Sequence, residues 1–197
     1  MKLQYILPVL VALPASAFAD NTSLNIRPFV GYDINLASSS NVKIKQSGTE
    51  LGRTDSVFFN DDNAGDFVFG VEFDDVMAVS LNPSITKVKI KGVGTDKINE
   101  IDAQFDFYLT RNSNFKPFAT LKMGYMSMDG DVKASGLGFG LDIGCRQYIN
   151  DNIYLGTNLT YNISTKMHVD EINGINVSGV NMRTSGFSLT IGGGYRF

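Results

Sequence analysis

The chain alternates between apolar and polar residues over most of its length, and this pattern predicts β-strands. Successive side chains of a strand point to opposite faces, so a period of two gives each strand one apolar and one polar face. We predict a final strand over residues 187–197 that separates two different environments. One face would carry Phe187, Leu189, Ile191, Tyr195 and Phe197, and the other Ser188, Thr190, Gly192, Gly194 and Arg196.

The same alternation predicts seven earlier strands, and therefore an all-β protein. The connections between these strands are short and long in strict alternation, which places every short turn at one end of an antiparallel up-and-down sheet. The earlier strands are predicted at about residues 25–37, 65–73, 77–86, 98–110, 115–126, 137–148 and 153–164, and the longer connections at 38–64, 87–97, 127–136 and 165–181.

Two of the longer connections contain alternation of their own. Val42-Lys43-Ile44-Lys45 lies in the first and Val88-Lys89-Ile90-Lys91 in the second. We therefore expect the early strands to continue past the main sheet as a protruding extension. Near Thr86 the alternation changes phase, which indicates either a β-bulge or the limit of the apolar layer.

The N-terminal segment has the pattern of a secretory signal peptide. Lys2 supplies a positive start, residues 6–13 are mostly apolar, and Ala17 and Ala19 form a small-x-small cleavage pattern before Asp20. The apolar run is too short to cross a bilayer as a helix. We predict a signal peptide at residues 1–19 and a single mature domain at residues 20–197.

Composition narrows the class of protein further. The formal net charge is −3, and loss of the one Lys in the signal segment would make it −4, so nothing indicates nucleic acid as a partner. Cys145 is the only cysteine, which excludes an internal disulfide. No apolar run is long enough for a membrane helix. A chain of this kind can cross a membrane only as a closed sheet, because lipid offers no hydrogen bonds to an open strand edge.

The polar face of the predicted strands has the properties of a narrow barrel interior. It is rich in glycine, and its isolated charges are close to balance, with five acids and four bases, as burial requires. We predict an interior charge cluster at the short-turn end, with Arg27 and Glu72 on neighbouring strands. The cluster would contain Arg27, Glu72, Asp106, Arg146 and Arg196; the remaining interior charges are Asp33, Asp102, Lys122 and Asp142.

Taken together, these features resemble the small eight-stranded outer-membrane barrels of the OmpA/OmpX type. The C-terminal pattern resembles their assembly signal, with Thr190, Gly192, Tyr195 and Phe197 at its positions. The resemblance implies a transmembrane β-barrel in the outer membrane of a Gram-negative bacterium, with short periplasmic turns and longer extracellular loops. It also implies contact with outer-membrane lipids and with the barrel assembly machinery. Trp is absent, so Tyr and Phe would form the interfacial aromatic belt.

An eight-stranded barrel is filled by its own side chains, which disfavours a wide pore. We therefore expect a structural or surface-interaction role, such as that of an adhesin or antigen, without a cofactor. The expected contact with an extracellular protein or host surface is through loops 38–64 and 87–97, where an exposed strand edge could pair with a partner strand.

Two other functions remain open from the sequence. One is an enzyme that modifies lipid A, with His168 beside Asp170 and Glu171 and with Ser164 or Ser178 as the nucleophile. Nothing in the spacing defines such a site. The other is a soluble lipocalin-like barrel, in which the apolar face would point inward around a ligand. The acidic loop residues show no regular calcium-binding spacing, so we predict no metal site.

Overall fold

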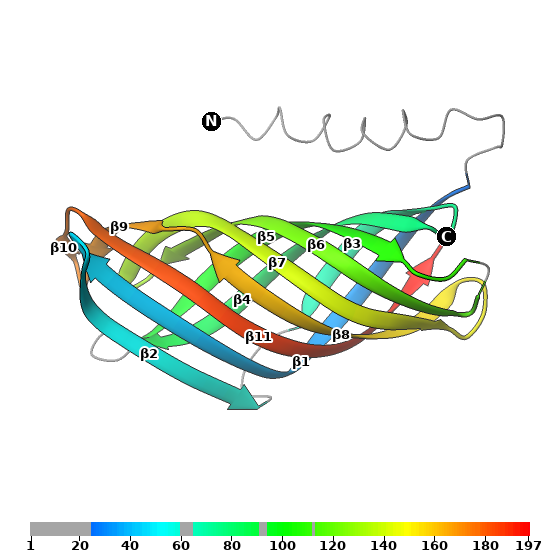
Figure 1. Ribbon diagram of the computed structural model, residues 1–197, viewed down its shortest axis with the longest axis horizontal. Helices are drawn as coiled ribbons and strands as arrows, with labels where there is room; N and C mark the ends of the chain where they lie inside the picture. Colours follow the sequence, from blue (N-terminus) through cyan, green and yellow to red (C-terminus); the bar gives the residue numbers. More distant parts are fainter. Residues whose placement is uncertain (1–24, 60–64, 91–93, 112) are drawn as a thin grey trace.

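The computed structural model describes residues 25–59, 65–90, 94–111 and 113–197, and its described regular elements are all strands (Figure 1). The predicted signal cleavage residues Ala17, Ala19 and Asp20 lie outside these ranges. No helix in the described part is long and apolar enough to cross a membrane. The strands are β1 (Ile26–Gln46), β2 (Thr49–Phe59), β3 (Asp66–Phe73), β4 (Met77–Ile90), β5 (Gly94–Tyr108), β6 (Phe115–Asp129), β7 (Val132–Tyr148), β8 (Ile153–Ser164), β9 (Met167–Ile172), β10 (Ile175–Asn176) and β11 (Val180–Arg196).

Eight of these strands form the wall of a barrel. Each pairs antiparallel with its neighbour in the order β1, β3, β4, β5, β6, β7, β8, β11. The last strand then pairs with the first, from Phe29 opposite Arg196 to Gln46 opposite Val180, and this pairing closes the ring. The predicted eight-stranded up-and-down architecture is confirmed.

The apolar face of the wall points outward. Leu141 is 58% exposed and Ile191 is 46% exposed, and large apolar side chains from every wall strand share this orientation. On the opposite, polar face of the wall, Asp102, Asp106 and Asp142 are buried inside the barrel. This orientation excludes the lipocalin-like alternative, which needs the apolar face inside.

Most strands are longer at one end than the alternation of the main sheet alone predicts. β1 continues to Gln46 and forms a hairpin with β2, so most of the segment expected as loop 38–64 is sheet. β4 and β5 likewise extend into the segment expected as loop 87–97. The expected loops 127–136 and 165–181 also contain strand residues. The alternation inside the first two segments had indicated this protruding extension.

Of the two explanations offered for the phase change near Thr86, the bulge is wrong, and the limit of the apolar layer stays a prediction. β4 pairs with β5 in an unbroken register from Met77 to Ile90, so there is no bulge at that position. The register shifts instead in β1, between Asn35 and Ala37. An extra residue in one strand exchanges its two faces. This bulge therefore decides which side chains of outer β1 point into the barrel.

Three tight turns close hairpins with both central residues at positive φ. At the short-turn end these are Asp74 (φ 49°) and Asp75 (φ 55°), and the Val76 N–H donates to the Phe73 carbonyl at 2.9 Å. At the other end, Ser47-Gly48 and Asn173-Gly174 have the same backbone form. Two-residue turns of this type match the twist of the flanking strands and favour Asn, Asp and Gly.

One part of the wall has incomplete pairing. β3 pairs with β4 only from Phe69 opposite Leu81 to Phe73 opposite Met77. Beyond Leu81, β4 pairs with β5 alone, and β2 pairs with β1 alone, within the described residues. Two strand edges therefore lack a ladder partner at the long-connection end.

The outward orientation predicts a strong position dependence for charge on the apolar face. Leu141→Arg, near the middle of the band, should lower the free energy of unfolding in lipid by about 2–4 kcal/mol. The matched variant Leu109→Arg, beside a short turn, should cost at most about 1 kcal/mol because its charge reaches water. Urea titrations of the two variants in lipid vesicles measure this difference. Equal costs at the two positions would contradict the outward orientation.

Candidate functional site

The barrel interior at the short-turn end is filled by aromatic rings and charged groups. Seven buried side chains pack there in one cluster. Each comes from an inward-facing strand position or from the residue next to a turn, so the alternation of the wall brings them together. They are Phe29, Val68, Ala78, Tyr108, Phe118, Tyr148 and Tyr154.

The rings and charged groups that fill the short-turn end form a plug. Glu72 lies at the centre of its charged groups. Its side chain is 1% exposed. Oε1 accepts hydrogen bonds from Lys116 Nζ at 2.9 Å and from Arg196 at 2.8 Å, and Oε2 accepts one from the Tyr148 hydroxyl at 2.7 Å. Two buried cations therefore share one carboxylate. Removal of that carboxylate would leave Arg196 without its closest acidic partner and would leave Lys116 with Asp75 alone.

Arg146 and Asp106 form a second buried pair in the same layer. The Arg146 Nη2 to Asp106 Oδ2 distance is 2.6 Å, and Thr120 donates to the other carboxylate oxygen at 2.7 Å. The guanidinium also lies 5.1 Å from the centre of the Phe29 ring and 5.2 Å from that of Phe118. Rings and carboxylate together replace the water that this cation loses on burial.

Four of the five residues of the predicted charge cluster lie in these two groups, and Arg27 lies apart. Arg27 is opposite Glu72 in the strand register, but its closest acid is Asp75, at 3.8 Å. Its side chain is 31% exposed, so it lies at the rim.

The sequence analysis missed two members of the plug, Lys116 and Asp75. Lys116 Nζ lies 2.5 Å from Asp75 Oδ1 and 2.9 Å from Glu72 Oε1. Its position has the same parity as Phe118 and Thr120, which was a signal that it faces inward. Asp75 is a turn residue, and no periodicity could indicate the direction of its side chain.

Above the plug lies a polar cavity of about 130 Å³. Four acids and one base are among its lining residues, and the base, Lys122, donates to Asp142 in the adjoining interior at 2.8 Å. Within the described ranges, no three His, Cys, Asp or Glu side chains are grouped so that they could hold a metal ion. The four lining acids are Asp33, Asp66, Glu100 and Asp102.

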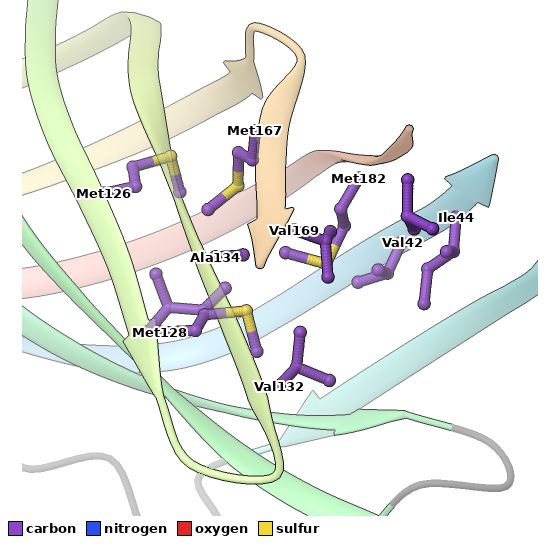
Figure 2. Packing of buried hydrophobic residues seen from close by; sticks show 11 residues of the cluster. Val42, Ile44, Met126, Met128, Val132, Ala134, Met167, Val169 and Met182 are labelled. Atoms are coloured by element: carbon purple, nitrogen blue, oxygen red, sulfur yellow. The ribbon is translucent and has the colours of Figure 1, made fainter. Parts of the chain in front are cut away.

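An apolar cap covers this cavity at the long-connection end. Figure 2 shows methionines and small aliphatic side chains from β1, β6, β7, β9 and β11 packed together. Met167 and Met182 are fully buried, and Val42, Ile98 and Met126 also line the cavity below. The complete cap consists of Val42, Ile44, Ile98, Met126, Met128, Val132, Ala134, Met167, Val169, Val180 and Met182.

The interior thus has three layers: a plug of rings and ion pairs, a small polar cavity, and an apolar cap. Side chains close-pack in the first and third layers. Within the described residues, side chains therefore occupy both ends of the interior. The remaining surfaces for interaction are the outer end and the outward face.

The residues considered for catalysis do not form a site. His168 Nε2 lies 3.4 Å from Asp170 Oδ1, and both side chains are more than 60% exposed. Ser164 is buried inside the barrel, where its hydroxyl accepts a hydrogen bond from the Thr184 N–H at 2.8 Å. The nucleophile and base of the proposed mechanism therefore lie on opposite faces of the wall. Ser178 precedes β11, and its backbone carbonyl accepts a hydrogen bond from Gln46 Nε2 at 3.4 Å.

The residues of the C-terminal pattern alternate across the wall. Thr190 faces the interior, whereas Tyr195 and Phe197 are exposed on the apolar face with ring centres 5.1 Å apart. Gly192 lies opposite Asp33, whose carboxylate occupies the space that a Cβ at position 192 would need. The assembly role of this pattern stays a prediction.

Comparison with known families agrees with this architecture. A family model described as outer membrane protein beta-barrel domain matches residues 5–197. The chain belongs to this family. It is an outer-membrane protein of a Gram-negative bacterium, as the resemblance to small outer-membrane barrels implied, and its wall strands cross that membrane. The short turns are periplasmic and the long connections extracellular.

The chain is also similar to solved structures of outer-membrane barrels, and the first two of the three that follow support the fold. Outer membrane protein AlkL in lipid bilayers is 17% identical, with 91% of this chain and 94% of that chain covered and a TM-score of 0.61. The protease OmpT from Escherichia coli is 10% identical, with 90% and 99% covered and a TM-score of 0.50. Neisserial surface protein A is 19% identical, with 89% and 100% covered and a TM-score of 0.49. No curated protein matches the sequence.

The shared carboxylate in the plug makes Glu72 the residue whose loss should destabilise the barrel most. Glu72→Ala leaves Lys116 and Arg196 buried with Asp75 as their remaining partner, so we expect a loss of about 3–5 kcal/mol in the free energy of unfolding. Glu171→Ala, which removes the partner of the exposed Lys133, should change stability little. Urea unfolding in lipid vesicles measures both. A barrel that tolerates Glu72→Ala as well as Glu171→Ala would show that the plug does not depend on this carboxylate.

Asp75 should make the periplasmic end sensitive to acid. Partial burial tends to raise the pKa of its carboxyl, but a side-chain hydrogen bond with Glu72 and the nearby Lys116 and Arg27 together outweigh burial and hold the pKa well below its ordinary value. A depressed pKa stabilises the folded state above the unfolded-state pKa of about 4, and this stabilisation is lost as the pH falls further. Asp75→Asn should therefore lower stability at neutral pH and flatten its decline below about pH 4. Urea midpoints measured across this range test it; a parallel decline in both proteins would contradict the assignment.

Proposed function

We propose that this outer-membrane barrel has a structural and surface-interaction role, carried by its extracellular end, and that it neither catalyses a reaction nor forms a wide pore. The observation that carries the proposal is the combination of a filled interior with strands that continue past the hydrocarbon layer. β1 runs over 21 residues, whereas about 9–11 suffice for a tilted strand to cross the bilayer. The excess forms an extracellular sheet.

The β1–β2 hairpin and outer β4 support a specific mode of contact. In the described part of the chain, neither the outer edge of β2 nor the β3-facing edge of β4 beyond Leu81 has a ladder partner. Unpaired N–H and C=O groups on such an edge can bind an extended segment of another protein by strand addition. The partner class that fits is an extracellular or host-surface protein with an extended segment.

The exposed position of His168 and the buried position of Ser164 support a role without catalysis. An acyl-transfer site needs its nucleophile and base within hydrogen-bond reach of each other. These two side chains leave the wall on opposite faces.

A shortened hairpin tests the surface role. Lys43 lies opposite Arg53, so removing residues 43–53 and joining the strands with an Asn-Gly turn preserves the register of the stump. This variant lacks the part of the β2 edge up to residue 53, which would pair with a partner strand. Bacteria that display it should therefore bind immobilised host-surface proteins or host cells about tenfold less than bacteria that display the full barrel.

The control for this experiment is Glu50→Gln, which changes one exposed charge and keeps the hairpin backbone. Altered gel migration without boiling verifies that each variant is folded in the membrane. Undiminished adhesion of the shortened variant would eliminate the hairpin as the contact surface.

A further inference from the structure

A row of basic side chains crosses the outward face of the extracellular sheet. Lys43 on β1 lies directly opposite Arg53 on β2 and directly opposite Arg183 on β11. Residues opposite each other in an antiparallel pair share a face, so the three cations lie side by side across three strands. Lys45 and Lys166 extend the basic surface at its two sides.

This surface contains a groove that no described acidic residue lines, although Glu50 on β2 lies opposite Lys45 in the strand register. The groove has a volume of about 440 Å³, and its charged lining residues are Lys43, Lys45, Lys166 and Arg183. In the described ranges, none of these four side chains forms an ion pair. Elsewhere in the protein, bases such as Lys116, Lys133 and Arg146 do have acidic partners.

Like charges that face each other across a strand pair destabilise a sheet. An anion bound in the groove would attract each of these cations and so offset the repulsion between them. Arg and Lys are the side chains with which proteins bind phosphate, Arg through two parallel hydrogen bonds and Lys as a point charge. The groove therefore has the charge and the donors for a phosphate-bearing group.

The height of the row above the membrane indicates where this phosphate comes from. On β11 the lipid-facing apolar side chains extend from Tyr195 to Phe187, and Ser185 pairs with the exposed Ile163 just beyond. Arg183 follows two residues later on the same face. With a rise of about 3.3 Å per residue and a tilt of about 45°, it lies about 5 Å above the level of Ile163.

The aromatic pair Tyr161 and Phe187, with ring centres 4.7 Å apart, lies immediately below this level. Tyr and Phe at such a position mark the boundary between hydrocarbon and headgroups. The basic row therefore lies within the headgroup layer of the outer leaflet. A lipid phosphate reaches this layer without leaving the membrane, whereas a soluble anion has to enter it from water.

We propose that the groove around Lys43 and Arg183 binds the phosphate groups of a phosphorylated lipid headgroup in the outer leaflet. The two central bases contact phosphate, and Lys45 and Lys166 add to the attraction at the edges. The proposal is independent of any protein partner at the β2 edge.

Native mass spectrometry of the full mature barrel, released from nanodiscs that contain phosphatidylcholine and a small fraction of bisphosphorylated lipid A, tests the proposal. The wild-type barrel should retain lipid A. The double variant Lys43→Gln/Arg183→Gln should retain less lipid A by a factor of about ten or more, because two charges near the surface are lost. Arg111→Gln, an exposed base at the periplasmic end, is the matched control and should behave as wild type.

Stability without the lipid provides a second measurement that also verifies folding. In pure phosphatidylcholine, Arg183→Gln should raise the thermal midpoint, since it removes one charge from the row of like charges. With lipid A present, the same variant should gain less stability than wild type. Lipid A without phosphates and a soluble polysulfated sugar are the two comparison ligands.

Three results would overturn the proposal. Equal retention of lipid A by the double variant and the wild type would show that the groove does not hold it. Equal retention of lipid A that lacks phosphates would show that phosphate is not recognised. Displacement of lipid A by the soluble sulfated sugar at micromolar concentration would assign the groove to a soluble anion instead of a lipid.

Discussion

The structure depends on one constraint, which is that every backbone N–H and C=O group within the hydrocarbon layer needs a partner inside the protein. The pairing of β1 with β11 satisfies this constraint, because it removes the two edges that an open sheet of these strands would expose to lipid. Closure also fixes the two faces. The apolar face has no core to pack against and meets lipid, whereas the polar face is enclosed in a narrow space.

Enclosure explains the unequal layers of the interior. Near the periplasmic end, Glu72, Asp75 and Asp106 are hydrogen-bonded to Lys116, Arg196 or Arg146, and rings fill the remaining space. The middle layer contains the polar cavity and holds more acids than bases, with room for water beside them. At the extracellular end, methionines replace charges, and their flexible side chains can fill an irregular space. Among the described residues, the central polar cavity therefore lies between a filled plug and a filled cap.

The sequence predicted what depends on periodicity and left undecided what depends on side-chain direction at irregular positions. Eight strands, their faces and the rhythm of their turns follow from alternation, and the small, balanced polar face indicated the interior. Arg27 shows the limit: register places it opposite Glu72, but a long side chain near the rim reaches Asp75 and water instead. Asp75 itself lies in a turn, where no period applies. The extent of outer β1 was underestimated because its apolar residues Val42 and Ile44 point inward, the opposite of the apolar residues in the membrane part of the wall.

The bulge between Asn35 and Ala37 links the interior of the extracellular end to its surface. Below it, odd-numbered residues of β1 such as Phe29 and Asp33 point inward; above it, the even-numbered Val42 and Ile44 do. Without the extra residue, both lysines of this segment would enter the barrel and both aliphatic side chains would face water. β11 has no such shift, so the bulge alone brings Lys43 onto the same outward face as Arg183. The bulge therefore has two consequences for outer β1. It directs the aliphatic side chains into the apolar cap, and it directs the lysines to the outer surface, where Lys43 joins the basic row.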